Sequence, residues 1–470
     1  MSSIQGTLAQ WRDRLRRREI SPVELVNLAA DAIEADRTTN AFISLDREAA
    51  LKEAAGADID SPLAGIPIAV KDNINIIGQP TRCASRLLAP YTSPYDATAI
   101  SLLRRAGGIP LGRTNMDEFA MGASGENSAY GFTRNPKAPE HIPGGSSSGS
   151  AAAVAAGTAI AALGSDTGGS IRQPAGHCGL VGLKPTYGRV SRYGLVAFAS
   201  SLDQIGPMTQ TVEDAAILLQ AIAGHDIKDS TSASQPVPDF AASLGRDIKG
   251  LKVGVPAEYV TSGNHPGVSD AVQNTLRRLE GMGAELVEIN LPHAEAVVAA
   301  YYIIACAEAS SNLSRFDGVR YGKRAENAAD LMDLFSQTRE EGFGAEVKRR
   351  IILGTYVLSS GYYDAYYARA QKVRSLVARD FADAFGKADV IVGPTSPTPA
   401  PKIGESARDH LQTYLADIYT IPANLTGLPA ISIPCGTVEE EGSVLPIGFQ
   451  IFAPHFREDL LFQTGSALEK

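Results

Sequence analysis

The sequence predicts a layered α/β fold, because helix signals and short strand-like apolar runs alternate along its 470 residues. Helix starts carry capping residues. In Ser21-Pro22-Val23-Glu24 a serine cap precedes a proline, and a glutamate follows three positions after the serine. Apolar runs such as 66–70 are too short for a typical helix and nearly lack polar residues, as buried strands do. Together these patterns favour a sheet covered by helices.

The remaining elements follow in chain order from the same signals. After the strand at 66–70, a helix is expected at 98–106, where Gly107-Gly108 ends it. Residues 122–150 are rich in Gly, Ser, Asn and Pro and are predicted to be loop. Further helices are expected from about 150, at 211–224, at 268–281 and at 364–385. Further strands are expected near 159–164 and at 251–255, 284–289, 389–393, 429–434 and 446–452.

The chain contains no internal repeat and no long low-complexity linker, so we expect one domain over residues 1–470. Within it we distinguish an N-terminal helical segment (1–60), a central core (61–225) and a remainder that completes the sheet (226–470). A helical insertion is expected near 294–375.

Composition excludes several classes of protein. The net charge of −9 disfavours a chain that grips nucleic acid by itself. The four cysteines are far apart, which argues against disulfides or a zinc site and fits the reducing cytoplasm. No signal peptide is visible, and the longest apolar runs, 151–164 and 296–307, are shorter than the ~20 residues of a membrane span. We therefore expect a cytoplasmic protein without a metal.

Two Gly/Ser-rich turns carry the chemical information. Gly144-Gly145-Ser146-Ser147-Ser148-Gly149-Ser150 precedes the first predicted helix after the loop, and Thr167-Gly168-Gly169-Ser170 follows the strand after it. Hydrolysis of an amide needs a nucleophile, a proton carrier and donors for the developing oxyanion. Glycines before a serine allow consecutive backbone N–H groups to point into one concavity. Ser170 is therefore a candidate nucleophile, with N–H donors from residues 167–170, and Ser146 a candidate proton relay.

The base is the remaining requirement. Histidine is the usual one, but none of the seven histidines lies in a recognisable pairing. A lysine can serve if it is neutral, although its ordinary pKa is about 10.4. Burial lowers the pKa of lysine, and Lys71, at the end of an apolar strand, is the best placed. Its neighbour Asp72 is expected to point elsewhere. Asp166 is expected to accept loop N–H groups and to pair with Arg172.

Other interpretations of the same motifs are weaker. Gly145–Gly149 formally matches the G-x-S-x-G nucleophile elbow, but no strand precedes it. The chain has no G-x-x-x-x-G-K-[ST] phosphate loop, and no cysteine lies in a nucleophile motif. A Gly/Ser-rich turn can also be a turn without chemistry, and a lysine that ends a strand is often a solvated charge.

These motifs closely resemble the amidase signature family. The resemblance runs from Gly144 to about Gly206 and includes Gly179–Thr186 and Asp203–Pro207. It implies a large mixed central sheet with helices on both faces, and a cis peptide bond before Ser146. By position, it implies that Ser170 is the acylated nucleophile, Ser146 the bridging serine and Lys71 the base.

Several segments are most similar to the glutamine-hydrolysing subunits of tRNA-dependent amidotransferases within this family: 126–131, 187–195, 359–367 and 417–424. The resemblance implies that the chain releases ammonia from glutamine and needs no cofactor of its own. Partner B and C subunits of a heterotrimer would hold the tRNA. With ATP and Mg they would use the ammonia to amidate Glu-tRNA(Gln), and often Asp-tRNA(Asn). By context, Tyr301, Arg350 and Asp417 would bind glutamine.

Two of these assignments remain open. Arg350 can instead be a surface charge beside Lys348 and Arg349. The alternatives for the whole chain are a free-standing amidase that acts on another small amide, and a non-catalytic scaffold subunit.

Overall fold

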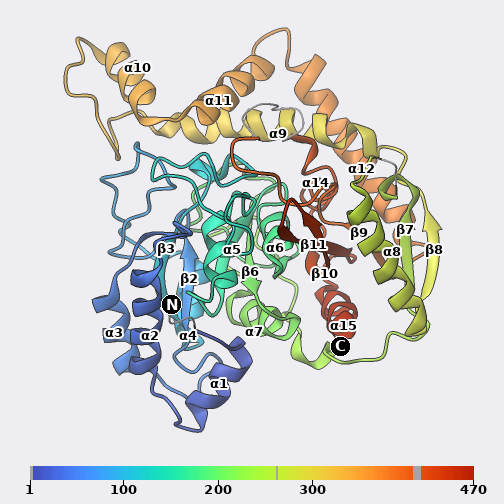
Figure 1. Cartoon of the computed structure of the whole chain (residues 1–470). Coiled ribbons are helices and arrows are strands. Elements are labelled where there is room, and N and C mark those ends of the chain that lie inside the picture. The colour runs from blue at the N-terminus through green and yellow to red at the C-terminus, as the bar shows by residue number, and fades with distance from the viewer. Residues whose placement is uncertain (1–3, 261–262, 406–413, 470) are drawn as a thin grey trace.

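The computed structural model describes residues 4–260, 263–405 and 414–469. Its centre is an 11-stranded sheet with the order β1-β3-β2-β4-β6-β5-β10-β11-β9-β7-β8. The sheet is mixed, because β2 is parallel to β3 and β4 whereas β4, β6, β5, β10, β11 and β9 run antiparallel in succession. Figure 1 shows the N-terminal strands at one end of the sheet and β7 and β8 at the other. The predicted α/β class with a mixed sheet is confirmed.

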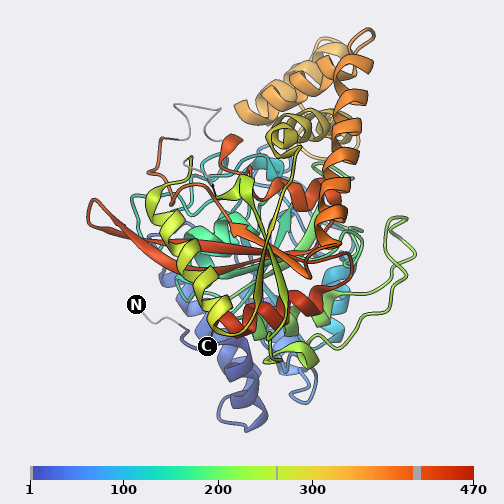
Figure 2. The same ribbon diagram turned by 90° about the vertical axis from the view of Figure 1, so that its right-hand side faces the viewer.

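The strands were predicted with uneven success. The expected strands correspond to β2 (Pro67–Lys71), β4 (Ala162–Asp166), β7 (Lys252–Pro256), β8 (Glu285–Ile289), β9 (Val390–Pro394), β10 (Ala430–Glu440) and β11 (Ser443–Phe452). The sequence did not indicate β1 (Phe42–Ser44), β3 (Ile109–Thr114), β5 (Val181–Lys184) and β6 (Gln204–Thr209). Part of the β10–β11 hairpin extends beyond the sheet, where its residues become exposed (Figure 2).

The helices cover both faces of the sheet. Those of the N-terminal half are α1 (Leu8–Arg16), α2 (Pro22–Ala35), α3 (Arg47–Ala55), α4 (Thr98–Arg105), α5 (Ser148–Ala155), α6 (Arg172–Cys178) and α7 (Val212–Ile222). Those that follow are α8 (Pro266–Gly281), α9 (Val297–Asn312), α10 (Leu331–Gly342), α11 (Ala345–Leu358), α12 (Arg369–Phe385), α14 (Ile421–Thr426) and α15 (Glu458–Leu468). The predicted helix at 364–385 begins as a π-helix over Asp364–Ala368 and continues as α12.

The alternation of side chains along β2 decides where the chemistry lies. Ile68 and Val70 belong to the core that includes α2, α4 and α7, whereas Ala69 belongs to a smaller core with α5 and α6. Because successive side chains of a strand point to opposite faces, Lys71 lies on the same face as Ala69. The strand therefore directs its terminal lysine toward the two Gly/Ser-rich turns.

The range 294–375, where a helical insertion is expected, contains α9, α10 and α11, which lie together at one end of the molecule (Figure 1). The structure extends the apolar run at 296–307 into a helical segment, Ala294–Arg315, that is long and apolar enough to span a membrane. More than half of its most apolar window is buried inside the protein, as in a core helix. One such segment is weak evidence for a membrane protein.

The contact between α9 and α11 yields a prediction about stability. A methyl group at Gly354 would come within 1.9 Å of the Cys306 carbonyl oxygen, a backbone atom that cannot move alone. Gly354→Ala should therefore separate the two helices and lower the free energy of unfolding by about 1–3 kcal/mol or more. Gly281→Ala, at a helical position with open space, is the matched control and should change it by less than about 1 kcal/mol. Chemical denaturation measures both. Equal stability of the two variants would contradict the close packing.

Candidate active site

Two neighbouring strands and two helix starts bring the candidate residues together. Strands β2 and β4 are adjacent and parallel, so their carboxyl ends meet at one edge of the sheet. Lys71 ends β2, and the turn 167–170 follows β4 directly. Ser146 lies just before α5, and Ser170 lies just before α6. The Gly145–Ser146 peptide bond is cis, as the family resemblance implies.

The Lys71 amine lies in a cluster of hydroxyl groups. Its Nζ is 2.8 Å from Ser146 Oγ, 2.8 Å from Ser147 Oγ and 3.0 Å from Ser165 Oγ. The side chain is fully buried, and burial lowers the pKa of Lys71 to about 7 even though Asp117, Asp166 and Asp203 act in the opposite direction. A sizeable fraction of the amine is therefore unprotonated near pH 7.

Asp72 does not contact this amine. Its carboxylate accepts a hydrogen bond from Arg113 Nε at 3.2 Å and another from the Arg82 N–H, so it points elsewhere as predicted.

Ser170 approaches the cluster through its backbone. Its carbonyl oxygen accepts the Ser147 N–H at 3.2 Å, which joins the two turns. Its hydroxyl makes no hydrogen bond with any residue that the structure describes, and the side chain keeps a small exposed fraction. The structure thus brings Lys71 and Ser146 into direct contact and joins the Ser170 turn to the neighbouring Ser147 through the backbone, while the Ser170 hydroxyl is unbonded among the described residues.

The turn that carries Ser170 is shaped by Asp166, as the sequence predicted. The Asp166 carboxylate accepts the N–H groups of Gly169 and Ile171 and two N–H groups of Arg172. Arg172 holds the pKa of Asp166 at about 2 against the effect of burial. Asp166 is therefore a charged acceptor and not an acid.

The predicted oxyanion donors differ in availability. The Gly169 N–H donates to Asp166 Oδ1 at 2.9 Å and is therefore already engaged in this conformation. The N–H groups of Thr167, Gly168 and Ser170 have no acceptor within the described part of the chain. These three groups are the free donors of the turn.

Of the three residues assigned to glutamine, Tyr301 lies against the same turn. A methyl group at Gly168 would come within 2.5 Å of the Tyr301 hydroxyl. Asp417 is buried, and its Oδ1 has no hydrogen-bond partner among the residues that the structure describes. Burial raises the pKa of Asp417 to about 8, although nearby Arg350 opposes the change.

Arg350 is 5% exposed, so its interpretation as a surface charge is wrong. It lies on the buried side of α11 with Val347, Gly354 and Val357, where it pairs with Glu346 and faces the rings of Tyr302 and Tyr414.

Several site residues were missed from the sequence. Ser147 and Ser165 contact the amine directly, and Asn73 donates to Ser165 Oγ at 2.9 Å. Ser147 adjoins the serine that the motif singled out, and Ser165 lies one residue before the end of β4, the strand next to β2, so parallel pairing of the two strands was the available signal. Among the described residues, no group of three or more His, Cys, Asp or Glu side chains could hold a metal ion.

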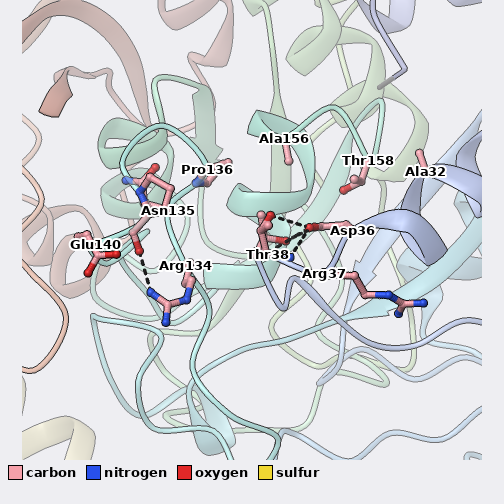
Figure 3. Close-up of a pocket in the computed structure, with 12 residues that line it drawn as sticks. Ala32, Asp36, Arg37, Thr38, Arg134, Asn135, Pro136, Glu140, Ala156 and Thr158 are labelled. Atoms are coloured by element: carbon pink, nitrogen blue, oxygen red, sulfur yellow. Dashed lines mark hydrogen bonds between the residues drawn. The ribbon is translucent and has the colours of Figure 1, made fainter. Parts of the chain in front are cut away.

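A separate cavity of about 550 Å³ lies between the end of α2, the loop 134–140 and the end of α5 (Figure 3). Two of its charged side chains are bonded locally. Arg134 donates to the Pro139 carbonyl, and Asp36 accepts the N–H groups of Thr38 and Thr39. None of the candidate catalytic residues lines it.

Comparisons with known proteins agree with this geometry. Residues 24–462 match the Amidase family model. The chain is 84% identical over the full length of both proteins to the A subunit of the glutamyl-tRNA(Gln) amidotransferase of Akkermansia muciniphila.

Two solved structures also match. The crystal structure of the glutamyl-tRNA(Gln) amidotransferase A subunit from Thermotoga maritima is 44% identical with a TM-score of 0.83, and the match covers 99% of this chain and 94% of that one. Native peptide amidase from Stenotrophomonas maltophilia is 31% identical with a TM-score of 0.82, and the match covers 99% and 96% of the two chains. The chain belongs to the amidase family.

Proposed function

We propose that this chain is the glutamine-hydrolysing subunit of a tRNA-dependent amidotransferase. The observation that carries the proposal is the fully buried Lys71 amine in contact with Ser146, beside a turn that ends in Ser170. The relatives are named as A subunits of glutamyl-tRNA(Gln) amidotransferases, which supports a tRNA-dependent amidotransferase built from several subunits. The released ammonia would serve to convert Glu-tRNA(Gln) to Gln-tRNA(Gln), and Asp-tRNA(Asn) is a second candidate acceptor.

The substrate pocket suits the two charges of a free amino acid. A glutamine α-ammonium group would give a donor to Asp417 Oδ1, which has no partner in the described part of the chain, and its approach would favour the ionised carboxylate. Arg350 supplies the cation for the α-carboxylate, and Tyr301 lies between this region and the turn at Gly168. A buried acceptor without a partner is unfavourable until a ligand satisfies it, which favours a substrate with an amino group.

The proposed reaction begins at the neutral amine. The lone pair of Lys71 Nζ accepts the Ser146 proton, and Ser146 Oγ accepts the proton of Ser170 after the free hydroxyl of Ser170 turns toward it. Ser170 Oγ then attacks the side-chain amide carbon, and the free N–H groups of Thr167, Gly168 and Ser170 stabilise the oxyanion. The proton returns to the leaving nitrogen as ammonia departs, and water hydrolyses the glutamyl ester to glutamate.

The remaining parts of the reaction belong to other chains. We propose that partner B and C subunits complete a heterotrimer, that the tRNA is held mainly by a partner, and that ATP and Mg act there. The net charge of −9 supports a tRNA contact made elsewhere. We further propose that the assembly works in the cytoplasm.

The nucleophile is tested by Ser170→Ala in the complex assembled with co-expressed partner subunits. Ammonia release from glutamine should fall by at least 10³-fold, on the order of the loss of a covalent nucleophile. An ammonia-dependent transamidation assay should be unchanged. Ser314→Ala is the matched control, because Ser314 is exposed and lies outside both Gly/Ser-rich turns. Glutaminase turnover that survives in Ser170→Ala would refute the assignment.

The neutral base predicts how activity depends on pH. Only the unprotonated amine accepts a proton, so kcat/KM for glutamine should fall about tenfold per pH unit below a pKa near 7. Lys71→Arg should remove activity at every pH, because the guanidinium stays charged. The pH–rate profile of the wild-type complex measures the first effect. A flat profile between pH 5 and 8 would exclude Lys71 as the base.

The same amine affects folding stability. The pKa of Lys71 is lowered to about 7 in the folded chain from 10.5, so the unfolded chain binds more protons between these values and stability rises with pH there. The difference in unfolding free energy between wild type and Lys71→Met should therefore increase by roughly 2 kcal/mol from pH 7 to pH 9 in favour of wild type. Denaturation at the two pH values measures it, and a constant difference would mean that the amine is charged in the folded chain.

A further inference from the structure

The peptide unit between Gly168 and Gly169, one residue before Ser170, is hydrogen-bonded through both its carbonyl and its N–H group. The Gly168 carbonyl oxygen accepts the Thr420 hydroxyl at 2.7 Å, and the Gly169 N–H donates to Asp166 Oδ1 at 2.9 Å. These two bonds fix the plane of the Gly168–Gly169 peptide. Because the free N–H groups of Gly168 and Ser170 adjoin this peptide, its orientation determines where they point.

Thr420 belongs to the segment that carries Asp417. Its N–H donates to the Asp417 carbonyl at 3.0 Å, and its hydroxyl also lies 3.1 Å from that carbonyl. The single hydroxyl hydrogen is therefore shared between Gly168 and Asp417, with the shorter distance to Gly168. A small shift of the Asp417 backbone would change how the hydrogen is shared, and with it the strength of the hydrogen bond from Thr420 to the Gly168 carbonyl.

Thr420 and Tyr301 pack closely against the two glycines of the turn. A methyl group at Gly169 would come within 2.2 Å of Thr420 Oγ1, and one at Gly168 within 2.5 Å of the Tyr301 hydroxyl. The Thr420 carbonyl is itself fixed by Arg172 at 2.8 Å. In a close-packed interior such contacts transmit a displacement rather than absorb it.

We propose that Thr420 is a positioning residue that couples occupation of the α-amino site at Asp417 to the arrangement of the oxyanion turn. The enzyme would then cleave the side-chain amide of glutamine, which is bound through its amino group, faster than the amide of a substrate that lacks this group. Interactions remote from the reacting atoms are in this way used for chemistry instead of for binding alone. The inference rests on the proposed glutaminase function and deepens it.

A purely structural role for Thr420 predicts a different pattern. Thr420 also precedes α14, so loss of its hydroxyl could weaken the whole site. Such damage would slow every amide substrate alike. Coupling instead predicts a loss that depends on the substrate's amino group, so the comparison of two substrates separates the roles.

The test uses the assembled complex with Thr420→Val and Thr420→Ser. The substrates are glutamine and glutaramate, the same five-carbon amide acid without the α-amino group. For Thr420→Val, kcat for glutamine should fall about 10–100-fold with KM changed less than about threefold, as expected when an oxyanion site is mispositioned. The kcat for glutaramate should change less than about threefold, and Thr420→Ser should restore glutamine turnover. An equal loss on both substrates, or a change in KM alone, would overturn the proposal.

Two further variants complete the design. Thr426→Val removes a hydroxyl that donates to the Pro422 carbonyl in the same helix and does not contact the turn, so it should leave the turnover of both substrates unaffected.

In an Asp417→Asn background, Thr420→Val should add little further loss of glutamine turnover, and full additivity of the two losses would contradict coupling. This arm remains decisive if glutaramate turnover is too slow to measure. A wild-type complex that releases no ammonia from glutamine would reject the proposed function, whereas normal Thr420→Val kinetics beside an inactive Ser170→Ala would reject only the coupling.

Discussion

The site depends on one physical constraint, which is the burial of the Lys71 amine away from any directly bonded carboxylate. Each of the three carboxylates that act on it electrostatically is occupied by other donors. Asp117 accepts the N–H groups of Gly125 and Asn127, Asp166 is paired with Arg172, and Asp203 accepts the Thr167 hydroxyl and two backbone N–H groups. The amine is thus left with neutral oxygens as partners. Without compensation for a charge, burial favours the form that can accept a proton.

The sheet topology explains how this environment arises from distant segments. Parallel pairing of β2 and β4 brings Lys71 to the turn after β4, although 95 positions separate it from Asp166. The helix starts of α5 and α6 then supply the serines, since both helices pack on the face toward which Ala69 and Lys71 point. A solvated lysine at the end of a strand has the same sequence pattern. Only the cover provided by these two helices distinguishes the two environments.

Sequence reasoning succeeded where a local pattern decides the structure. Continuous apolar residues mark β2 and the first three positions of β9, whereas β3 and β6 contain internal glycine, proline and polar residues and show neither an apolar run nor an alternation of apolar and polar residues. The pairing of Asp166 with Arg172 was predictable because only a short turn separates them. The roles of Ser165 and Thr420 were not, because each depends on a contact with a segment far away in the chain. Arg350 shows the same limit, since its neighbours Lys348 and Arg349 suggested a solvated helix face, whereas only the packing of α11 shows that it is buried.

The residue that joins these segments is Arg172. Its five N–H donors meet five acceptors: both Asp166 carboxylate oxygens, the Thr420 carbonyl, Asn424 Oδ1 and Gln450 Oε1. Removing a guanidinium and a carboxylate from water costs several kcal/mol per ion, so a fully buried pair is tolerated only when its remaining hydrogen-bonding groups are also satisfied. Here that condition is met by residues from β4, α14 and β11, and an ammonium with three donors could not meet it. The ion pair is therefore better understood as a device that fixes the relative positions of the nucleophile turn and the substrate-binding segment than as a source of stability.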